Sequence, residues 1–206
     1  MYTPDPFKVH DPETLVAFIR QNSFATIVTH DGNVPHATHM PVLYHESGAG
    51  HGTLVSHMAR ANPQWRHFED SREVLVIFTG PHAYISPAWY TTPPAVPTWN
   101  YTAVHAYGIA SIVTDHDRFA AMLHELIEYY EAPRADRWPG EIPVEFRDKL
   151  MHGIVGIEIE ITRLEGKFKL SQNRPADSPG VIAALAASSD QTERELAEMM
   201  RQCIIG

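Results

Sequence analysis

The decapeptide SHMARANPQW, residues 56–65, concentrates groups that bind anions. Ser56 and His57 end a predicted strand, and Arg60 follows them directly. The pair Asn62–Pro63 is typical of an N-cap followed by the first residue of a short helix. A hydroxyl, an imidazole, a guanidinium and backbone N–H groups would then meet at one turn. The pattern predicts a site for a phosphate monoester, although an ordinary capped helix beside a solvated arginine would carry the same residues.

Aromatic rings and prolines are concentrated between residues 81 and 101. Loops usually carry small polar residues, so this concentration of stiff side chains indicates a specific role. Pro93, Pro94 and Pro97 rigidify a loop, which a core strand would not require. Rigid rings near a phosphate site indicate a planar phosphorylated cofactor. The alternative is that the rings are part of the hydrophobic core.

Metal and nucleophile chemistry find little support in the sequence. There are thirteen histidines, but His36 and His39 are three apart on a predicted strand and so face opposite sides. No His-Glu-x-x-His motif is present, and no cysteine accompanies these histidines. No Gly-x-Ser-x-Gly elbow surrounds Ser56 or Ser86. We therefore predict neither a metal site nor a catalytic residue.

Composition limits the location and the partners of the chain. No apolar run approaches the ~20 residues that span a bilayer, and the first residues lack a basic region followed by an apolar core. We expect a cytoplasmic protein with no membrane contact. Cys203, the single cysteine, fits a reducing compartment and is expected to be a buried thiol. A net charge of -9 argues against a broad basic surface for nucleic acid.

The elements that must position these groups follow from hydrophobic periodicity and turn signals. Strands are expected at 24–30, 34–45, 53–58, 74–80, 82–86, 99–115 and 154–164, the last followed by a Glu165–Gly166 turn and a partner strand. Helices are expected to begin at Asp11, Asn62, Asp115, Pro143, Ser178 and Asp190. Strands that follow one another without alternating helices predict a β-rich α+β fold, a small antiparallel barrel with peripheral helices.

Six stretches of the chain together resemble one known family: MYTPDPF, THMP, HMARANPQW, PHAYISPAWY, VPTWNYTAVHAYG and KLSQNR. They resemble the PaiB-type FMN-binding negative transcriptional regulators, from residue 1 to about residue 174. The resemblance implies a split β-barrel similar to that of pyridoxamine-phosphate oxidase, a homodimer with FMN at the subunit interface, and repression of sporulation and protease genes. It divides the chain into an FMN-binding split-barrel domain, 1–174, and a C-terminal helical extension, 175–206, packed on the barrel or the dimer.

The resemblance also implies the residues of the cofactor site. Ser56, His57, Arg60 and Asn62 match the phosphate side, and the strand Thr38, His39 and Met40 matches the flavin edge. Five further residues match family signatures without an assigned contact: Trp99, Asn100, Tyr101, Gln172 and Arg174.

The regulator function rests on family analogy, so an alternative stays open. An FMN-dependent oxidoreductase acting on a small molecule could affect gene expression indirectly, and whether the protein is an enzyme is undecided at this stage. No predicted helix carries the basic face of a recognition helix. Direct binding to DNA is therefore expected to be weak or absent.

Overall fold

The computed structural model describes residues 1–48, 50–68, 73–138, 140 and 142–205. Its strands are β1 (Lys8–Val9), β2 (Phe24–His30), β3 (Pro35–Pro41), β4 (Leu43–His45), β5 (Thr53–Ala59), β6 (Glu73–Ile85), β7 (Thr98–Val113) and β8 (Ile154–Lys169). Its α-helices are α1 (Pro12–Gln21), α2 (His116–Glu131), α3 (Val144–Met151), α4 (Ser178–Ala186) and α5 (Gln191–Ile205). Short 3-10 helices are η1 (Asp5–Phe7), η2 (Pro63–Phe68) and η3 (Pro87–Trp89).

The chain forms two compact units, which are described separately. The first contains Met1–Asn22, Phe78–His105 and Glu165–Gly206, and the second contains Ser23–Ile77 and Ala106–Leu164. The strands follow the order β3-β2-β6-β7-β8-β5-β4, and β1 pairs with β8. The unit boundaries fall within β6, β7 and β8.

In the second unit, hydrogen bonds form near the two ends of the strand order. The two end strands of the order, β3 and β4, are consecutive in the chain and separated by Val42 alone. The Ser56 hydroxyl on β5 donates to the Pro41 carbonyl at the end of β3, at 2.5 Å. The Val42 N–H donates to the Ser23 carbonyl at 2.8 Å. The first bond links β5, next to one end of the strand order, to β3 at the other end, and the second holds the β3–β4 connection against the start of β2.

The predicted hairpin of β2 and β3 is confirmed. Asp31 Oδ1 accepts from the N–H groups of Asn33 and Val34 at 2.7 and 2.8 Å, and Gly32 adopts a φ of 99°. A residue with a side chain would be strained at that φ. The Val34 N–H, then the His36 side chain, lower the pKa of Asp31 below its usual range. The ionised carboxylate is thus part of the turn.

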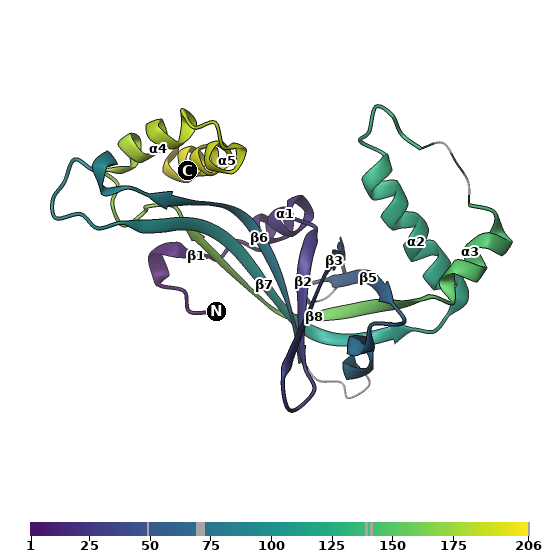
Figure 1. Cartoon of the computed structure of the whole chain (residues 1–206). Helices are drawn as coiled ribbons and strands as arrows, with labels where there is room; N and C mark the ends of the chain where they lie inside the picture. The colour runs from purple at the N-terminus through teal and green to yellow at the C-terminus, as the bar shows by residue number, and fades with distance from the viewer. Residues whose placement is uncertain (49, 69–72, 139, 141, 206) are drawn as a thin grey trace. The chain divides into compact units, whose positions relative to one another are not determined.

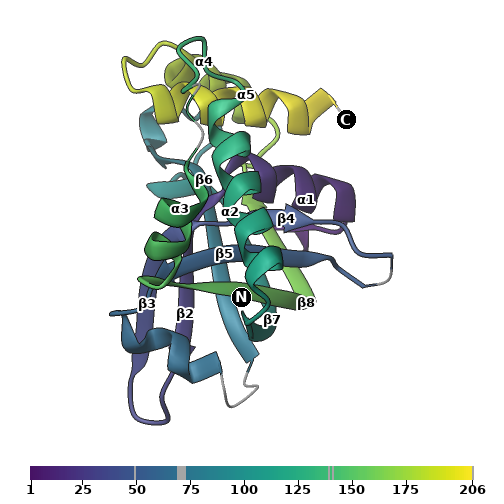
Figure 2. The same ribbon diagram turned by 90° about the vertical axis from the view of Figure 1, so that its right-hand side faces the viewer.

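Helix α2 begins where the sequence predicts. Asp115 Oδ1 accepts from the Arg118 N–H at 2.7 Å, the N-cap bond. Met122 and Leu126 on α2 pack with Leu43 and Val55 in one buried cluster. Figure 2 shows α2 lying across β5. No helix among the described residues is long and apolar enough to cross a bilayer.

The first unit has its own core. The Asp11 carboxylate caps α1, which buries Leu15, Phe18 and Ile19 as predicted. Helices α4 and α5 lie together over the ends of β6 and β7 (Figure 1). Their buried residues form a cluster with the strands: Ala83, Ile85, Leu170, Val181, Ile182, Leu185, Leu196, Ala197 and Met200.

Three local predictions are wrong. The segments 74–80 and 82–86 form one strand, β6, and the turn expected at Glu165–Gly166 is instead continuous strand in β8. Gly166 is required by a close approach, because a Cβ there would lie 2.2 Å from a methyl of Leu15. The short helix expected after Asn62 is confirmed, as the 3-10 helix Pro63–Phe68. Cys203 is exposed rather than buried.

Candidate functional site

Two of the predicted site residues, Thr38 and Asn62, meet in the second unit. Asn62 Nδ2 donates to Thr38 Oγ1 at 2.8 Å, and Thr38 Oγ1 donates to Gln64 Oε1 at 2.5 Å. Asn62 also caps η2, since its Oδ1 accepts from the Gln64 N–H at 3.1 Å. The polar network therefore fixes the turn after β5 against β3.

Gln64 is the centre of this network and was missed by the sequence analysis. Its side chain is buried, with 2% of its surface exposed. Nε2 donates to the carbonyls of Ile27 and His36 at 3.1 and 3.2 Å and lies 3.1 Å from Thr29 Oγ1. One glutamine thus joins η2 to both strands of the hairpin. Its position directly after Pro63 gives no pattern that would have revealed this.

Ser56, His57 and Arg60 do not converge on one point. Ser56 and His57 are adjacent on β5, so their side chains point to opposite faces. The Ser56 hydroxyl donates its hydrogen bond to the Pro41 carbonyl. Arg60 donates from Nε to the His152 carbonyl at 2.9 Å and from Nη2 to the Ile154 carbonyl at 3.0 Å. These bonds occupy two of the five N–H donors of a guanidinium, so the anchored Arg60 retains donors for an anion.

The β3 residues Thr38, His39 and Met40 alternate between the two faces of the strand. Met40 is buried, and His39 is exposed with its Nδ1 2.8 Å from Thr26 Oγ1. A planar ring on the His39 face would contact imidazole and hydroxyl groups, whereas Met40 belongs to the core.

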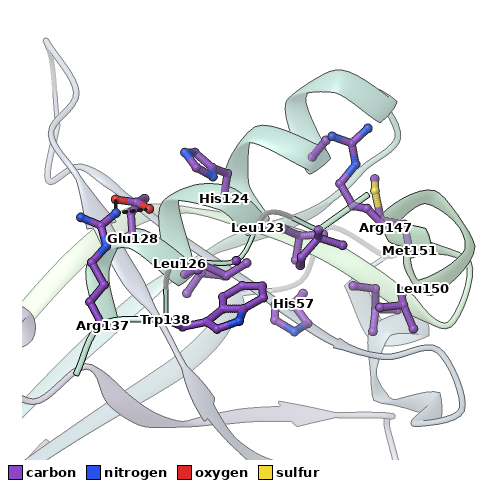
Figure 3. Close-up of a pocket in the computed structure, with 15 residues that line it drawn as sticks. His57, Leu123, His124, Leu126, Glu128, Arg137, Trp138, Arg147, Leu150 and Met151 are labelled. Carbon is purple, nitrogen blue, oxygen red and sulfur yellow. Dashed lines mark hydrogen bonds and ion pairs between the residues drawn. The ribbon is translucent and has the colours of Figure 1, made fainter. Parts of the chain in front are cut away.

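A cavity of about 840 Å³ lies between α2, α3 and the half-buried His57 (Figure 3). Its apolar lining includes Leu123, Leu126, Leu150 and Met151. This volume is typical of small-molecule sites. Part of the apolar face of α2 lines the cavity.

His57 is one of the polar groups that line this cavity. Its Nδ1 is buried and has no hydrogen bond among the described residues. Burial lowers the pKa of the imidazole. This direction favours the neutral imidazole, which can donate a hydrogen bond to a ligand or accept one from it.

A second, smaller pocket of about 130 Å³ lies in the first unit. Two predicted residues, Asn100 and Arg174, line it together with Lys169 and Ser171. Asn100 is fully buried and donates from Nδ2 to Ser171 Oγ at 2.8 Å. Its Oδ1 has no hydrogen bond among the described residues. A buried carbonyl oxygen without a donor is a site for a ligand N–H or O–H.

Lys169 supplies positive charge to this pocket and was not predicted. Its Nζ donates to Thr98 Oγ1 at 2.7 Å and to the Trp99 carbonyl at 2.5 Å. Burial, then the neighbouring Lys167, lowers its pKa. An anion in the pocket would relieve both effects.

The remaining predicted residues lie in the same unit but do not line the pocket. Gln172 closes its own turn by accepting from the Leu170 N–H at 2.7 Å and donating to the Phe168 carbonyl at 2.6 Å. Trp99 is 54% exposed. The Lys167 ammonium lies 5.1 Å from the Tyr101 ring centre, a cation–π contact.

Asp177 holds the aromatic, proline-rich loop in place. Its carboxylate accepts from the backbone N–H groups and both hydroxyls of Thr91 and Thr92, and from Arg174 Nη1 at 3.0 Å. Arg174 Nη2 donates in turn to the Pro94 carbonyl at 2.6 Å. The loop is therefore fixed by polar bonds as well as by its prolines.

This network predicts an acid-dependent stability. The Thr92 hydroxyl, followed by the Thr91 N–H and Arg174, lowers the pKa of Asp177 below the ordinary value of 3.8. A group with a lowered folded-state pKa stabilises above its unfolded pKa and loses that effect as the pH falls. We expect the urea concentration at the midpoint of unfolding to decrease when the pH is lowered below about 4. Asp177→Asn should be less stable at pH 7 and show a shallower decline in acid; an unchanged profile would contradict the assignment.

Comparisons with known proteins identify the family of the chain. A family model described as "Putative FMN-binding domain" matches residues 1–163. "Protease synthase and sporulation protein PAI 2" of Bacillus subtilis is 41% identical over 203 residues, 97% of this chain and 96% of that protein.

Solved structures with a similar fold include two proteins of low sequence identity. The flavocytochrome Anf3 from Azotobacter vinelandii has a TM-score of 0.60 at 14% identity, covering 79% of this chain and 69% of that one. The FAD and heme binding protein from Mycobacterium smegmatis has a TM-score of 0.57 at 15% identity, covering 79% and 73%. The predicted split-barrel fold class is confirmed, and the family match confirms FMN as the predicted cofactor.

Proposed function

This chain belongs to the FMN-binding family defined by that model, and we propose that it is a PaiB-like negative regulator that binds FMN at a homodimer interface. The observation that carries the proposal is the 41% identity to the Bacillus subtilis sporulation protein across 97% of the chain. Bound FMN would supply one- or two-electron redox chemistry. The chain itself supplies binding and orientation.

The donor sets in both units fit FMN chemically. Arg60, held by two main-chain carbonyls, keeps donors for the phosphate. Asn100 offers a buried acceptor, and Lys169 offers a half-buried cation. FMN carries a dianionic phosphate, ribityl hydroxyls and a ring N–H, which are the complements of these groups. We assign the FMN phosphate to the Arg60 turn of the second unit, and the Asn100 pocket of the first unit is a separate candidate for the polar atoms of a flavin.

Exposed rings in the first unit support a dimer. Tyr84, Val96 and Trp99 are 44%, 69% and 54% exposed. The Tyr84 and Trp99 rings meet edge to face, with centroids 6.1 Å apart. Grouped apolar residues of this size on a surface are typical of protein–protein contacts. Light scattering after size exclusion should give a dimer for the wild type and a monomer for Trp99→Lys.

The phosphate assignment predicts a difference between FMN and riboflavin. Arg60→Ala should weaken FMN binding about 10- to 150-fold, because a charge-assisted hydrogen bond contributes roughly 1.5–3 kcal/mol. Riboflavin, which lacks the phosphate, should bind the variant as it binds the wild type. Quenching of flavin fluorescence measures both affinities.

The matched control for this experiment is Arg66→Ala. Arg66 lies in the same segment but stacks on Trp65, 5.4 Å from the ring centre. If Arg60→Ala weakens the affinity for FMN and for riboflavin equally, the phosphate binds at another place. A wild-type protein that binds no FMN would refute the cofactor function itself.

Regulation without direct DNA contact is the remaining part of the proposal. None of the described α-helices carries an excess of basic over acidic residues, and the net charge is -9. Phosphate contacts supply most non-specific affinity for DNA. We expect weak binding in fluorescence anisotropy on promoter and random duplexes. Tight, salt-sensitive and sequence-selective binding would instead support a direct repressor.

A further inference from the structure

A second cluster of polar residues lies at the closed end of the β2–β3 hairpin, apart from the residues assigned to FMN. One potential ligand atom each of Asp31, His36 and His67 lies within 4.8 Å of the others. His36 Nε2 is 3.0 Å from Asp31 Oδ2. The His36 and His67 rings meet edge to face with centroids 4.8 Å apart.

The surrounding bonds hold each group of the cluster in place. The Asp31 carboxylate is fixed through Oδ1 by two backbone N–H groups, so Oδ2 is directed to His36. His67 Nδ1 lies 2.8 Å from Thr29 Oγ1. Thr29 pairs with His36 across the hairpin, so both side chains share one face. The buried Gln64 amide donates to the same Thr29 oxygen at 3.1 Å.

This arrangement matches the requirements of a transition-metal site. Two imidazoles and one carboxylate are ligands that suit first-row divalent ions. Metal-bound histidines usually donate their other ring N–H to a fixed oxygen, as Nδ1 of His67 can do to Thr29, which leaves Nε2 for the ion. Two ligands 3.0 Å apart, each about 2.1 Å from an ion, subtend about 90° at it. That angle suits adjacent positions of an octahedral ion whose other positions hold water.

We propose that Asp31, His36 and His67 form a binding site for a first-row divalent transition-metal ion, with Thr29 as a positioning residue. The site is independent of the FMN assignment, since none of these four residues is part of it. Sequence analysis excluded a metal by considering His36 and His39. The third ligand, His67, is distant in sequence and reaches the hairpin only through η2.

The test uses the full-length protein stripped of metal with EDTA and titrated with Zn²⁺ by calorimetry and with Co²⁺ by visible absorption. We expect one ion per chain, with a Co²⁺ spectrum typical of nitrogen and oxygen ligands. Asp31→Asn, His36→Ala and His67→Ala should each weaken binding by about 100-fold or more. Thr29→Val should weaken it about 10- to 100-fold, the usual effect of losing an outer-shell partner.

Controls separate loss of the site from loss of the fold. Asp31→Asn keeps an amide oxygen that can accept the turn bonds, so its metal-free unfolding midpoint should stay near that of the wild type. His51→Ala removes an exposed histidine outside the cluster and should bind both ions as the wild type does. Absence of saturable binding by the wild type would overturn the proposal. So would unchanged binding in the three ligand variants, or an equal loss in His51→Ala.

Discussion

Gln64→Leu is expected to lower the free energy of unfolding by about 3 kcal/mol, because it leaves several buried acceptors without their donor. The carbonyls of Ile27 and His36 lose the Nε2 bonds, and the Thr38 hydroxyl loses its acceptor. Leucine has a similar volume, so little of the loss would come from a cavity. The cost is that of unpaired polar groups in a buried network.

Urea unfolding at pH 7 measures this loss. Gln191→Leu is the matched control, because the Gln191 side chain is exposed and donates to Glu195 on the surface of α5. It should change the free energy of unfolding by less than about 0.5 kcal/mol. A Gln64→Leu protein as stable as the wild type would mean that water satisfies the same carbonyls, and the network would lose its structural role.

The same substitution should also reduce FMN affinity. The Gln64 side chain accepts from the Thr38 hydroxyl, to which Asn62 Nδ2 donates in turn, and Thr38 and Asn62 belong to the predicted flavin-edge and phosphate sets. Their geometry would relax even in the folded variant. Titration with FMN well below the unfolding temperature separates this effect from global unfolding.

Local signals in the sequence were sufficient for the elements that frame the site. The Asp31–Gly32 turn requires a positive φ that glycine tolerates, and the structure has it. Asp11 and Asp115 accept N-cap bonds as predicted. In each case the two bonded residues are at most three positions apart in the chain, so the local sequence contains both partners of the bond.

Contacts between distant segments could not be predicted in this way. Arg60 is anchored by carbonyls at positions 152 and 154, and nothing in the local pattern distinguishes it from a solvated arginine. Gly166 was taken as a turn residue because glycine serves turns and close approaches equally well. Only the position of Leu15 against β8 shows which role applies. Lys169 was missed because a lysine on an alternating strand is usually exposed.

The structure distributes the predicted site residues in ways that the sequence signatures do not indicate. Asn100 and Arg174, predicted from separate signatures, line one pocket, whereas Ser56, His57 and Arg60, predicted from one signature, do not converge. Adjacency along a strand places side chains on alternate faces, so neighbours in sequence are separated in space. A motif therefore does not indicate which side chains meet in the fold.

Asn100→Leu is expected to lower flavin affinity at least tenfold while leaving stability nearly unchanged. The Oδ1 atom of Asn100 is buried with no donor among the described residues, so the native fold already carries the cost of that oxygen. Leucine removes this cost but leaves the Ser171 hydroxyl without its donor. The two effects should offset to within about 1 kcal/mol. A ligand N–H or O–H that meets Asn100 would lose its acceptor entirely.

Ser171→Ala provides the opposite pattern. It removes the partner of Nδ2 but keeps the Asn100 carbonyl oxygen, so it should cost about 1 kcal/mol of stability and little flavin affinity. Thermal unfolding and titrations with both FMN and riboflavin measure the pair of variants. Asn100→Leu should weaken both ligands equally, because the proposed contact is not with the phosphate. A loss confined to FMN would place the phosphate in the Asn100 pocket beside Lys169, and no loss of either ligand would make Asn100 a purely structural residue.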